Sequence, residues 1–474
     1  MEVLSVTKGR NGSTRSANAD GILGHNRVTP DCQQPSVDDT PPAPVPPTPV
    51  APADPVLALL QTDLQRADDG CWTAQHGPYR LGTHFQAIYS LSHHRAVGHE
   101  ALLRAHDDQG RPVPAPTVLA SAGSPEDLVY LDRLCRLVHV ANFARAARGD
   151  QWLFLNIHPA VFVHAPAMGA GRFMEMLLQR FGLAPQQIVL EVTEDMVGRD
   201  QDFERAVAQA RGLGCLLALD DFGAGHSNFD RVWRIQPEIV KLDRSFVRRA
   251  ATEPRIGRIA MQMVSLLHAC GAMVLMEGIE TPEEAYLALQ ADVDFVQGYL
   301  FGRPSPLLHL PGEPQPQIDA VWARFDAQYD ADKRAERDRL APYANAIGQA
   351  ATLLQSGLPL EACCREFLAL PGAELCYLID EQGLQLEHNV TSPHFEALRS
   401  PQFAPLRDSR GARWARRPYF RRAMDNFGRV QVTRPYLTVH GAHLCVTVSV
   451  SLRWKGQLVV LGGDIAWEPD PQLG

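Results

Sequence analysis

Val240-Lys241-Leu242-Asp243 is the stretch from which the fold can be worked out. It continues the apolar run Glu238–Val240, which has the length and composition of a short buried strand. Lysine is rare in a chain with 45 basic residues, and it occurs only at Lys8, Lys241, Lys333 and Lys455. A lone lysine at a strand end, with acids at other strand ends, indicates a site that needs a compact, protonatable cation.

Short apolar runs alternate with longer amphipathic segments from residue 56 to about residue 305. The strand candidates are His84–Ser90, Ala96–Leu103, Trp152–Ile157, Gln187–Val192, Cys215–Leu219, Glu238–Val240, Ala272–Met276 and Asp294–Val296. The helix candidates are Glu126–Ala147, Arg172–Phe181, Phe203–Leu213, Arg255–Ala269 and Pro282–Leu289. This alternation predicts an α/β fold, a TIM-type (β/α)8 barrel. A doubly wound open sheet is the competing fold, although no glycine-rich phosphate loop opens the first unit.

Polar residues stand at or beside the ends of nearly all these strand candidates. They are Glu100, Asn156, Glu191, Asp220, Asp221, Lys241, Glu277 and Gln297. In a β/α barrel the carboxyl ends of the strands form one mouth, and active sites lie there. We therefore expect side chains that are far apart in the sequence to converge in one pocket.

The composition of this set limits its chemistry. Several carboxylates and an amide, without clustered His or Cys, suit Mg²⁺ or Mn²⁺ rather than Zn²⁺. Two such ions, about 3.5–4 Å apart, can activate a water and stabilise the leaving oxygen of a phosphodiester. Asp220-Asp221 is a natural source of a bridging carboxylate, Lys241 could position the water, and Arg104 could bind a phosphate through its guanidinium fork.

The segment Glu100-Ala101-Leu102-Leu103-Arg104 resembles the signature of the EAL-domain cyclic-di-GMP phosphodiesterases. The resemblance covers about half of the chain, in order and with plausible spacing. It continues through Phe85-Gln86, Asn156, Glu191-Val192-Thr193-Glu194, Asp220-Asp221-Phe222-Gly223, Lys241-Leu242-Asp243, Glu277-Gly278-Ile279-Glu280 and Gln297-Gly298-Tyr299-Leu300-Phe301-Gly302-Arg303-Pro304.

This resemblance implies a barrel that hydrolyses cyclic-di-GMP to 5′-pGpG with two Mg²⁺ or Mn²⁺ ions, and a homodimer formed through the barrel. It assigns the metal ligands to Glu100, Asn156, Glu191, Asp220 and Asp221. It makes Lys241, Glu277, Glu194 and Gln297 catalytic: Lys241 contacts the water, Glu277 helps to hold it, and Gln297 orients nearby groups. Gln86, Arg104 and Glu280 are assigned to substrate binding. Glu194 and Glu280 would also brace the loop after the fifth strand, which couples dimerisation to metal binding.

The chain departs from the family pattern outside the metal ligands. The loop after the fifth strand has Ala224, His226 and Asn228 where Thr, Tyr and Ser are usual. The other departures are Ala87, Ala105 and His158. They concern loop dynamics, dimer coupling and turnover more than the chemistry. The alternative function is a non-catalytic cyclic-di-GMP receptor that acts through a partner protein.

The second half of the chain shows a different pattern. Residues 313–355 predict a helical linker, and residues 356–474 predict an α+β domain. The stretch 414–423 and the ending 461–465 resemble Cache-type, PAS-like sensor domains. The resemblance suggests that a small ligand is held by Arg413, Trp414, Tyr419, Tyr436 and Asp464. Aromatic residues that pack a small core, or a dimerisation module, are the alternatives.

Composition sets the remaining expectations. The net charge of −9 and pI near 6.0 argue against general nucleic-acid binding. No stretch approaches the length of a membrane span, and the N-terminus lacks the apolar region of a signal peptide, so we expect a cytoplasmic protein. The nine scattered cysteines are expected to be free thiols. Residues 1–55 are Pro-rich and predict a disordered tail.

Overall fold

The structure is a computed structural model that describes most of the chain after residue 63. It describes residues 64–147, 149, 151–164, 170–193, 201–225, 229–310, 313–393, 395, 408–438 and 443–467. The expected tail at residues 1–55 lies outside these residues.

Eight strands close into a barrel. They are β3 (Tyr79–Ser90), β4 (Arg95–His106), β6 (Trp152–Asn156), β7 (Ile188–Thr193), β8 (Leu216–Phe222), β9 (Ile239–Leu242), β10 (Met273–Met276) and β11 (Phe295–Val296). Each pairs with the next in this order, and β11 returns to β3. The barrel confirms the expected eight-stranded architecture, and the short strands β1 (Gln65–Arg66), β2 (Trp72–His76) and β5 (Pro112–Val113) extend its sheet.

The first strand departs from a regular (β/α)8 barrel. Strand β3 is antiparallel to both neighbours, β4 and β11, whereas the other barrel pairs are parallel. The physical reason is the short connection of residues 91–94, because parallel neighbours need a crossover of a dozen or more residues. The expectation that every barrel strand runs the same way was therefore wrong for β3.

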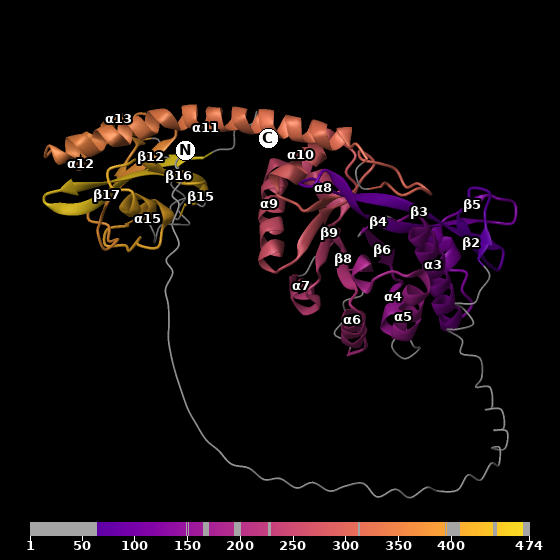
Figure 1. Cartoon of the computed structure of the whole chain (residues 1–474). Coiled ribbons are helices and arrows are strands. Elements are labelled where there is room, and N and C mark those ends of the chain that lie inside the picture. The colour runs from indigo at the N-terminus through magenta and orange to yellow at the C-terminus, as the bar shows by residue number, and fades with distance from the viewer. Residues whose placement is uncertain are drawn as a thin grey trace, which may run out of the picture. The chain divides into compact units, whose positions relative to one another are not determined.

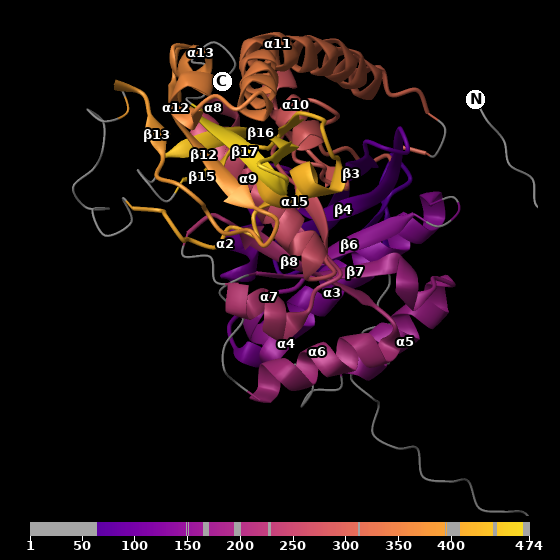
Figure 2. The same ribbon diagram turned by 90° about the vertical axis from the view of Figure 1, so that its left-hand side faces the viewer.

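Helices provide the crossovers between the parallel strands. They are α3 (Pro125–Ala146), α4 (Pro159–His164), α5 (Ala170–Phe181), α6 (Gln201–Leu213), α7 (Phe229–Ile235), α8 (Arg244–Thr252), α9 (Pro254–Ala269) and α10 (Pro282–Gln290); the short α2 (Ala115–Leu119) precedes α3. Helices α4, α5 and α6 lie along one outer side of β6, β7 and β8 (Figure 2). A continuous apolar core fills the space between helices and strands.

A second apolar cluster fills the interior of the barrel. Seven of the eight strands contribute one buried apolar side chain each: Ile88, Phe154, Val189, Ala218, Ile239, Leu275 and Phe295. These seven side chains close the interior of the barrel and are called the floor below. Polar side chains can occupy the inner face of the barrel only beyond this floor.

Helix α11 (Pro316–Gln355) is a single helix of 40 residues that belongs to two cores (Figure 1). Its first part buries Ile318 and Val321 in the barrel core, and its last part buries Ile347 and Leu354 in the core of the C-terminal sheet. The residues between are mostly exposed on all sides. This is the pattern of a polar helix that is stabilised by packing at its two ends.

The C-terminal domain is an antiparallel sheet with helices on both faces (Figure 1). Its strands are β12 (Ala373–Asp380), β13 (Val390–Thr391), β14 (Gln431–Val432), β15 (Tyr436–Leu437), β16 (Leu444–Trp454) and β17 (Gln457–Ala466). The end of α11, α12 (Leu360–Cys363) and α13 (Arg365–Leu368) cover one face. Helix α15 (Pro418–Asp425) packs on the other face.

The sequence pattern predicts a strand at residues 384–388 and one continuous helix at residues 360–368, and both predictions were wrong. Residues 384–388 do not form a strand, and they make only isolated bridges to Ile379 and Arg413. The expected helix at residues 360–368 is divided at Cys364, which ends α12 and precedes α13.

No helix among the residues that the structure covers has the length and apolarity needed to cross a bilayer. Each cysteine that the structure describes is a free thiol, as expected.

A first prediction concerns Gly298, which follows β11. A Cβ atom at this position would lie 2.0 Å from the backbone oxygen of Ile279. The Ile279 nitrogen and oxygen both hydrogen-bond to this turn, so the backbone cannot easily move away. We expect Gly298→Ala to lower the free energy of unfolding by at least about 3 kcal/mol, the upper end of the usual overpacking cost.

The matched control is Gly212→Ala in α6, where a Cβ atom would meet nothing within 4 Å. This change should leave stability unchanged or raise it by about 0.5–1 kcal/mol. Urea unfolding of both variants measures the difference. Equal stabilities would show that the turn after β11 is not constrained in this way.

Candidate active site

One layer of polar side chains lies directly above the apolar floor of the barrel. On six strands a polar residue stands two positions after the floor residue. The pairs are Phe154 and Asn156, Val189 and Glu191, Ala218 and Asp220, Ile239 and Lys241, Leu275 and Glu277, and Phe295 and Gln297. Side chains alternate between the two faces of a strand, so both members of each pair belong to the inner face.

The two remaining strands complete the layer. Glu100 lies two residues after Gly98 on β4, and a Cβ atom at Gly98 would lie 3.0 Å from the floor side chain Phe154. Gln86 pairs directly with Glu100 across the antiparallel β3–β4 ladder. The layer therefore receives a polar residue from each strand of the barrel. The strand-end pattern in the sequence indicated such a residue for every strand but the first, where Gln86 was named only through the family resemblance.

Lys241 lies at the centre of this layer and is only 1% exposed. Its Nζ is 2.5 Å from Glu191 Oε1, 2.6 Å from Glu277 Oε1 and 3.2 Å from Asp220 Oδ1. One ammonium thus joins the carboxylates of three different strand ends. A buried ammonium is stable only when paired in this way.

Glu100 is held by amides instead of by the lysine contact. Its Oε1 accepts a hydrogen bond from Asn156 Nδ2 at 2.9 Å, and its Oε2 accepts one from Gln297 Nε2 at 2.9 Å. These bonds and the lysine charge lower the pKa of Glu100, although burial acts in the opposite direction. Glu100 is therefore a fixed carboxylate of the layer.

Asp221 follows Asp220 at a backbone irregularity. The β8–β9 register shifts between Leu219 and Phe222, and Asp221 has a φ of 58°, in the left-handed region. Its backbone nitrogen donates to Asp220 Oδ1 at 2.9 Å. In a regular strand two consecutive side chains point to opposite faces, and this bulge is what frees the Asp221 side chain from that rule.

The buried acids are strongly perturbed. Burial, and then the neighbouring carboxylates, raise the pKa of Glu191 well above its usual value, although Lys241 opposes the rise. Burial likewise raises the pKa of Glu277 to about 8. Burial alone would lower the pKa of Lys241, but the surrounding acids outweigh it and raise that pKa well above its usual value. One ammonium does not balance all the acids around it.

The donor atoms fit a hard divalent cation in type. Glu191 Oε2 is buried without a hydrogen-bond donor in the described residues, whereas Oε1 of Glu191 and Oε1 of Glu277 face the Lys241 ammonium. Within the same residues no three Asp, Glu, His or Cys side chains are grouped closely enough to hold an ion. The Lys241 ammonium lies among the acids instead. Carboxylates and the Asn156 amide are the oxygen ligands that Mg²⁺ and Mn²⁺ prefer.

The expected substrate-binding residues lie around this layer. Gln86 Nε2 donates to the Gly302 oxygen at 3.3 Å, and Arg104 is half-buried with Nη1 on the Leu103 oxygen at 2.9 Å. Glu280 forms an ion pair with Arg244 at 2.9 Å, a partner that the sequence did not indicate. Glu194, His226 and Asn228 lie outside the described residues.

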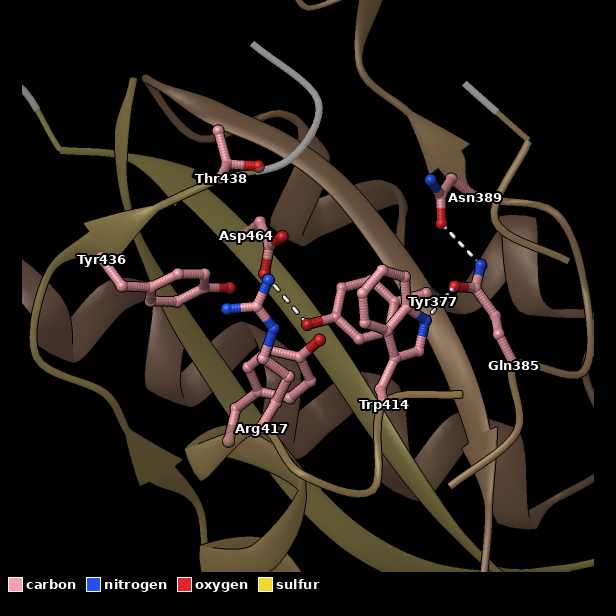
Figure 3. Close-up of a pocket in the computed structure, with 9 residues that line it drawn as sticks. Tyr377, Gln385, Asn389, Trp414, Arg417, Tyr436, Thr438 and Asp464 are labelled. Atoms are coloured by element: carbon pink, nitrogen blue, oxygen red, sulfur yellow. Dashed lines mark hydrogen bonds between the residues drawn. The ribbon is translucent and has the colours of Figure 1, made fainter. Parts of the chain in front are cut away.

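A second recess lies in the C-terminal domain (Figure 3). Its lining residues are Tyr377, Gln385, Asn389, Trp414, Arg417, Tyr419, Tyr436, Thr438 and Asp464. Its open volume of about 20 Å³ is enough for a water molecule but not for a larger ligand without some opening. The recess combines aromatic rings with one acid and one base.

Asp464 is the acid of this recess. Its Oδ1 accepts a hydrogen bond from Tyr377 at 3.1 Å (Figure 3). The same oxygen accepts a second hydrogen bond from Thr447 at 2.6 Å. The Tyr436 hydroxyl hydrogen-bonds to the same Thr447 hydroxyl at 2.6 Å. Burial, which these bonds only partly offset, raises the pKa of Asp464 to about 7.

Four of the five predicted ligand residues line the recess, and one does not. Arg413 is exposed and lies outside the lining, whereas Arg417 is part of it. The Arg417 guanidinium lies 5.9 Å from the Trp414 ring and 5.7 Å from the Tyr436 ring, and its Nε is buried without a partner. Pro418, at the first position of α15, was the available signal, because proline favours that position and places Arg417 at the cap.

The comparisons with known proteins concern the barrel. Residues 74–304 match the family model described as the EAL domain. This range contains every residue of the polar layer. Residues 74–304 therefore form an EAL domain, homologous to cyclic-di-GMP phosphodiesterases.

Two curated relatives from Pseudomonas aeruginosa illustrate the similarity. The cyclic di-GMP phosphodiesterase RocR is 34% identical over 158 residues, which are 32% of this chain and 40% of RocR. The cyclic di-GMP phosphodiesterase NbdA is 32% identical over 241 residues, which are 49% of this chain and 30% of NbdA. The chain thus spans less than half the length of these relatives.

One solved structure resembles most of the chain in fold. It is the Bacillus subtilis YkuI protein, with an EAL domain, in complex with substrate c-di-GMP and calcium. The match has a TM-score of 0.69 and 21% identity, and it covers 82% of this chain and 97% of YkuI. The shared fold includes more than the barrel, because the EAL match ends at residue 304.

A second prediction follows from Asp464. Because the folded-state pKa of about 7 exceeds the ordinary value, Asp464 favours the folded state below pH 4 and loses this contribution as the pH rises through about 7. We expect the C-terminal domain of the natural protein to lose stability between pH 5 and pH 8. The Asp464→Asn variant should lose less over the same range.

Scanning calorimetry of both proteins at several pH values measures this difference. The control is Asp425→Asn, because Asp425 is an exposed acid of the same domain at the end of α15. The pH dependence of Asp425→Asn should follow that of the natural protein at pH 5–8. Parallel curves for the natural protein and Asp464→Asn would contradict the raised pKa.

Proposed function

Because residues 74–304 form an EAL domain, we propose that this protein hydrolyses cyclic-di-GMP to 5′-pGpG in a reaction that requires Mg²⁺ or Mn²⁺. The observation that carries the proposal is the central position of Lys241, within 3.2 Å of carboxylates from three strand ends. One buried cation does not balance the several acids around it, and bound metal ions would supply the missing positive charge. The calcium and c-di-GMP named for YkuI agree with this reading.

In this proposal, five residues hold the metal ions: Glu100, Asn156, Glu191, Asp220 and Asp221. When bound, the ions supply Lewis acidity toward the phosphate oxygens and lower the pKa of a water molecule. Asn156 and Gln297 keep the Glu100 carboxylate in one orientation through their hydrogen bonds to it. The bulge at Asp221 allows two consecutive acids to serve the same site.

Lys241 and Glu277 act on the attacking water. The Lys241 ammonium orients the water and stabilises the negative charge that develops on the phosphate. Glu277, 2.6 Å from the Lys241 Nζ, accepts a hydrogen bond from the same water and fixes its lone pair toward phosphorus. Gln86 and Arg104 bind the substrate, and Arg104 pairs with its phosphate. Glu194 and Glu280 brace the loop after β8, and the barrel forms a homodimer.

A third prediction tests the proposed hydrolysis. Lys241→Met keeps the length of the side chain and removes its charge, so the water and the phosphate charge lose their cation. We expect hydrolysis of cyclic-di-GMP with Mn²⁺ to fall at least about 100-fold, as for loss of a main electrostatic or acid–base group. EDTA should abolish the hydrolysis by the natural protein.

Product chromatography measures 5′-pGpG in each sample. The matched control is Lys333→Met, because Lys333 is an exposed lysine of α11 that lies 4.3 Å from the Tyr329 ring. Lys333→Met should keep full activity. If the natural protein binds cyclic-di-GMP without hydrolysing it, the protein is a receptor that acts through a partner, which is the alternative function.

The C-terminal domain is proposed to be a sensor of Cache or PAS-like type that regulates the barrel. Support comes from the recess around Asp464, where an acid, a base and aromatic rings converge. Arg417 and Asp464 lie in the same recess without forming an ion pair within the salt-bridge distance among the described residues. The Arg417 guanidinium and the Asp464 carboxyl group are therefore both available to a small polar ligand.

A fourth prediction tests this recess with small molecules. We expect at least one compound in a panel of amino acids, carboxylates and amines to raise the unfolding midpoint of the natural protein and to change its hydrolysis rate. Asp464→Asn or Arg417→Gln should weaken the binding of that compound at least about tenfold, the cost of one charged hydrogen bond. The compound should therefore raise the unfolding midpoint of either variant less than that of the natural protein.

Arg413→Gln is the matched control, because this exposed arginine lies outside the recess. It should bind the compound as the natural protein does. A panel that shifts none of the proteins, or that shifts all of them equally, would count against a ligand site in the recess.

A further inference from the structure

A buried ion pair on α3 has no role in the chemistry described above. Asp132 and Arg136 are 5% and 4% exposed, respectively, and their side chains pair with each other. The pair lies next to the turn that follows β6, because Asp132 contacts the His158 nitrogen of that turn. The neighbouring cavity, which Arg136 lines, is otherwise walled mainly by apolar residues such as Ile157, Val161 and Leu190.

Such a pair is not explained by stability alone. Removing two charges from water costs more than their attraction returns in many proteins, and apolar replacements of similar volume are often as stable. The apolar wall shows that an apolar side chain would be accepted here. Arg136 also leaves its Nε buried without a hydrogen-bond acceptor in the described residues.

Asp132 makes one further contact that an apolar residue could not make. Its Oδ1 accepts a hydrogen bond from the backbone nitrogen of His158 at 3.2 Å, while Oδ2 pairs with Arg136. His158 lies two residues after Asn156, the amide at the end of β6. Arg136 therefore holds one oxygen of Asp132 so that the other faces the turn.

The turn is anchored at consecutive peptide groups. The Ile157 nitrogen donates to the Glu191 oxygen at 3.3 Å, and the His158 oxygen accepts from the Val161 and Phe162 nitrogens at the start of α4. The His158 nitrogen is the one anchor in this series that depends on a side chain. Asn156 immediately precedes these anchors, and its amide holds Glu100 at 2.9 Å.

We propose that Asp132, held by Arg136, is a positioning residue that fixes the turn after β6 and so orients Asn156 for metal binding. This inference rests on the proposed role of Asn156 as a metal ligand. Groups that orient a ligand from behind typically change metal affinity about 10–100-fold when they are removed. The pair would thus affect metal binding through Asn156 without itself contacting the metal.

The test uses the double variant Asp132→Leu/Arg136→Met in the full chain. Leu has nearly the shape of Asp, Met can follow the path of the Arg side chain, and neither member of the pair is left buried without the other. We expect an unfolding midpoint close to that of the natural protein. Titration calorimetry with Mn²⁺ alone should show at least about tenfold weaker binding.

Hydrogen exchange of the peptide that covers residues 152–162 gives a second readout, which does not depend on metal. It should be faster in the double variant, because the His158 amide has lost its acceptor. The control is Arg249→Gln/Glu253→Gln, an exposed pair at 3.5 Å on the same barrel, which should change neither readout.

The outcomes separate the inference from the proposed function. Unchanged exchange would overturn the positioning of the turn, and faster exchange with unchanged Mn²⁺ binding would overturn its link to Asn156. If the natural protein binds no Mn²⁺, the proposed metal site fails, and with it the proposed link from the turn to Asn156. The exchange data then still decide whether Asp132 holds the turn.

Discussion

The buried contacts of Lys241 are the constraint on which the barrel site depends. One ammonium, 1% exposed, lies within 3.2 Å of acids from β7, β8 and the end of β10. The ammonium lowers the pKa of Glu191 and Glu277 against the effect of burial and of the mutual repulsion of the acids, and the acids in turn raise the pKa of the ammonium. The strand ends must therefore stay in register for any one of these charges to be tolerated.

The apolar floor of the barrel makes this register possible. Each floor side chain fixes how its strand is rotated, and the next inward position then faces the mouth. The antiparallel first strand fits the same scheme, because Gln86 and Glu100 are direct partners across the ladder. Packing thus decides the direction of the polar residues, and charge decides what the resulting layer can bind.

In the C-terminal domain, packed side chains also orient charged groups, but the numbers of acids and bases differ from those in the barrel. Its recess contains one acid and one base among aromatic rings, and hydrogen bonds from Tyr377 and Thr447 hold the acid. Helix α11 contributes side chains to the core of the barrel and to the core of the C-terminal sheet. A ligand-dependent change in the C-terminal core would therefore act on a helix whose other end is anchored in the barrel core.

The sequence by itself determined the eight-stranded barrel, the residues of its polar layer and the presence of a second domain. These features depend on local periodicity, because a two-residue alternation within one strand already assigns each side chain to a face. Only the tertiary structure decided that β3 is antiparallel, that Arg417 rather than Arg413 lines the recess, and that Asp132 holds the turn after Asn156. Each of these depends on which distant segments meet when the chain closes. Local signals such as the short connection 91–94 and Pro418 bear on strand direction and on the helix cap, but they do not identify the distant partner.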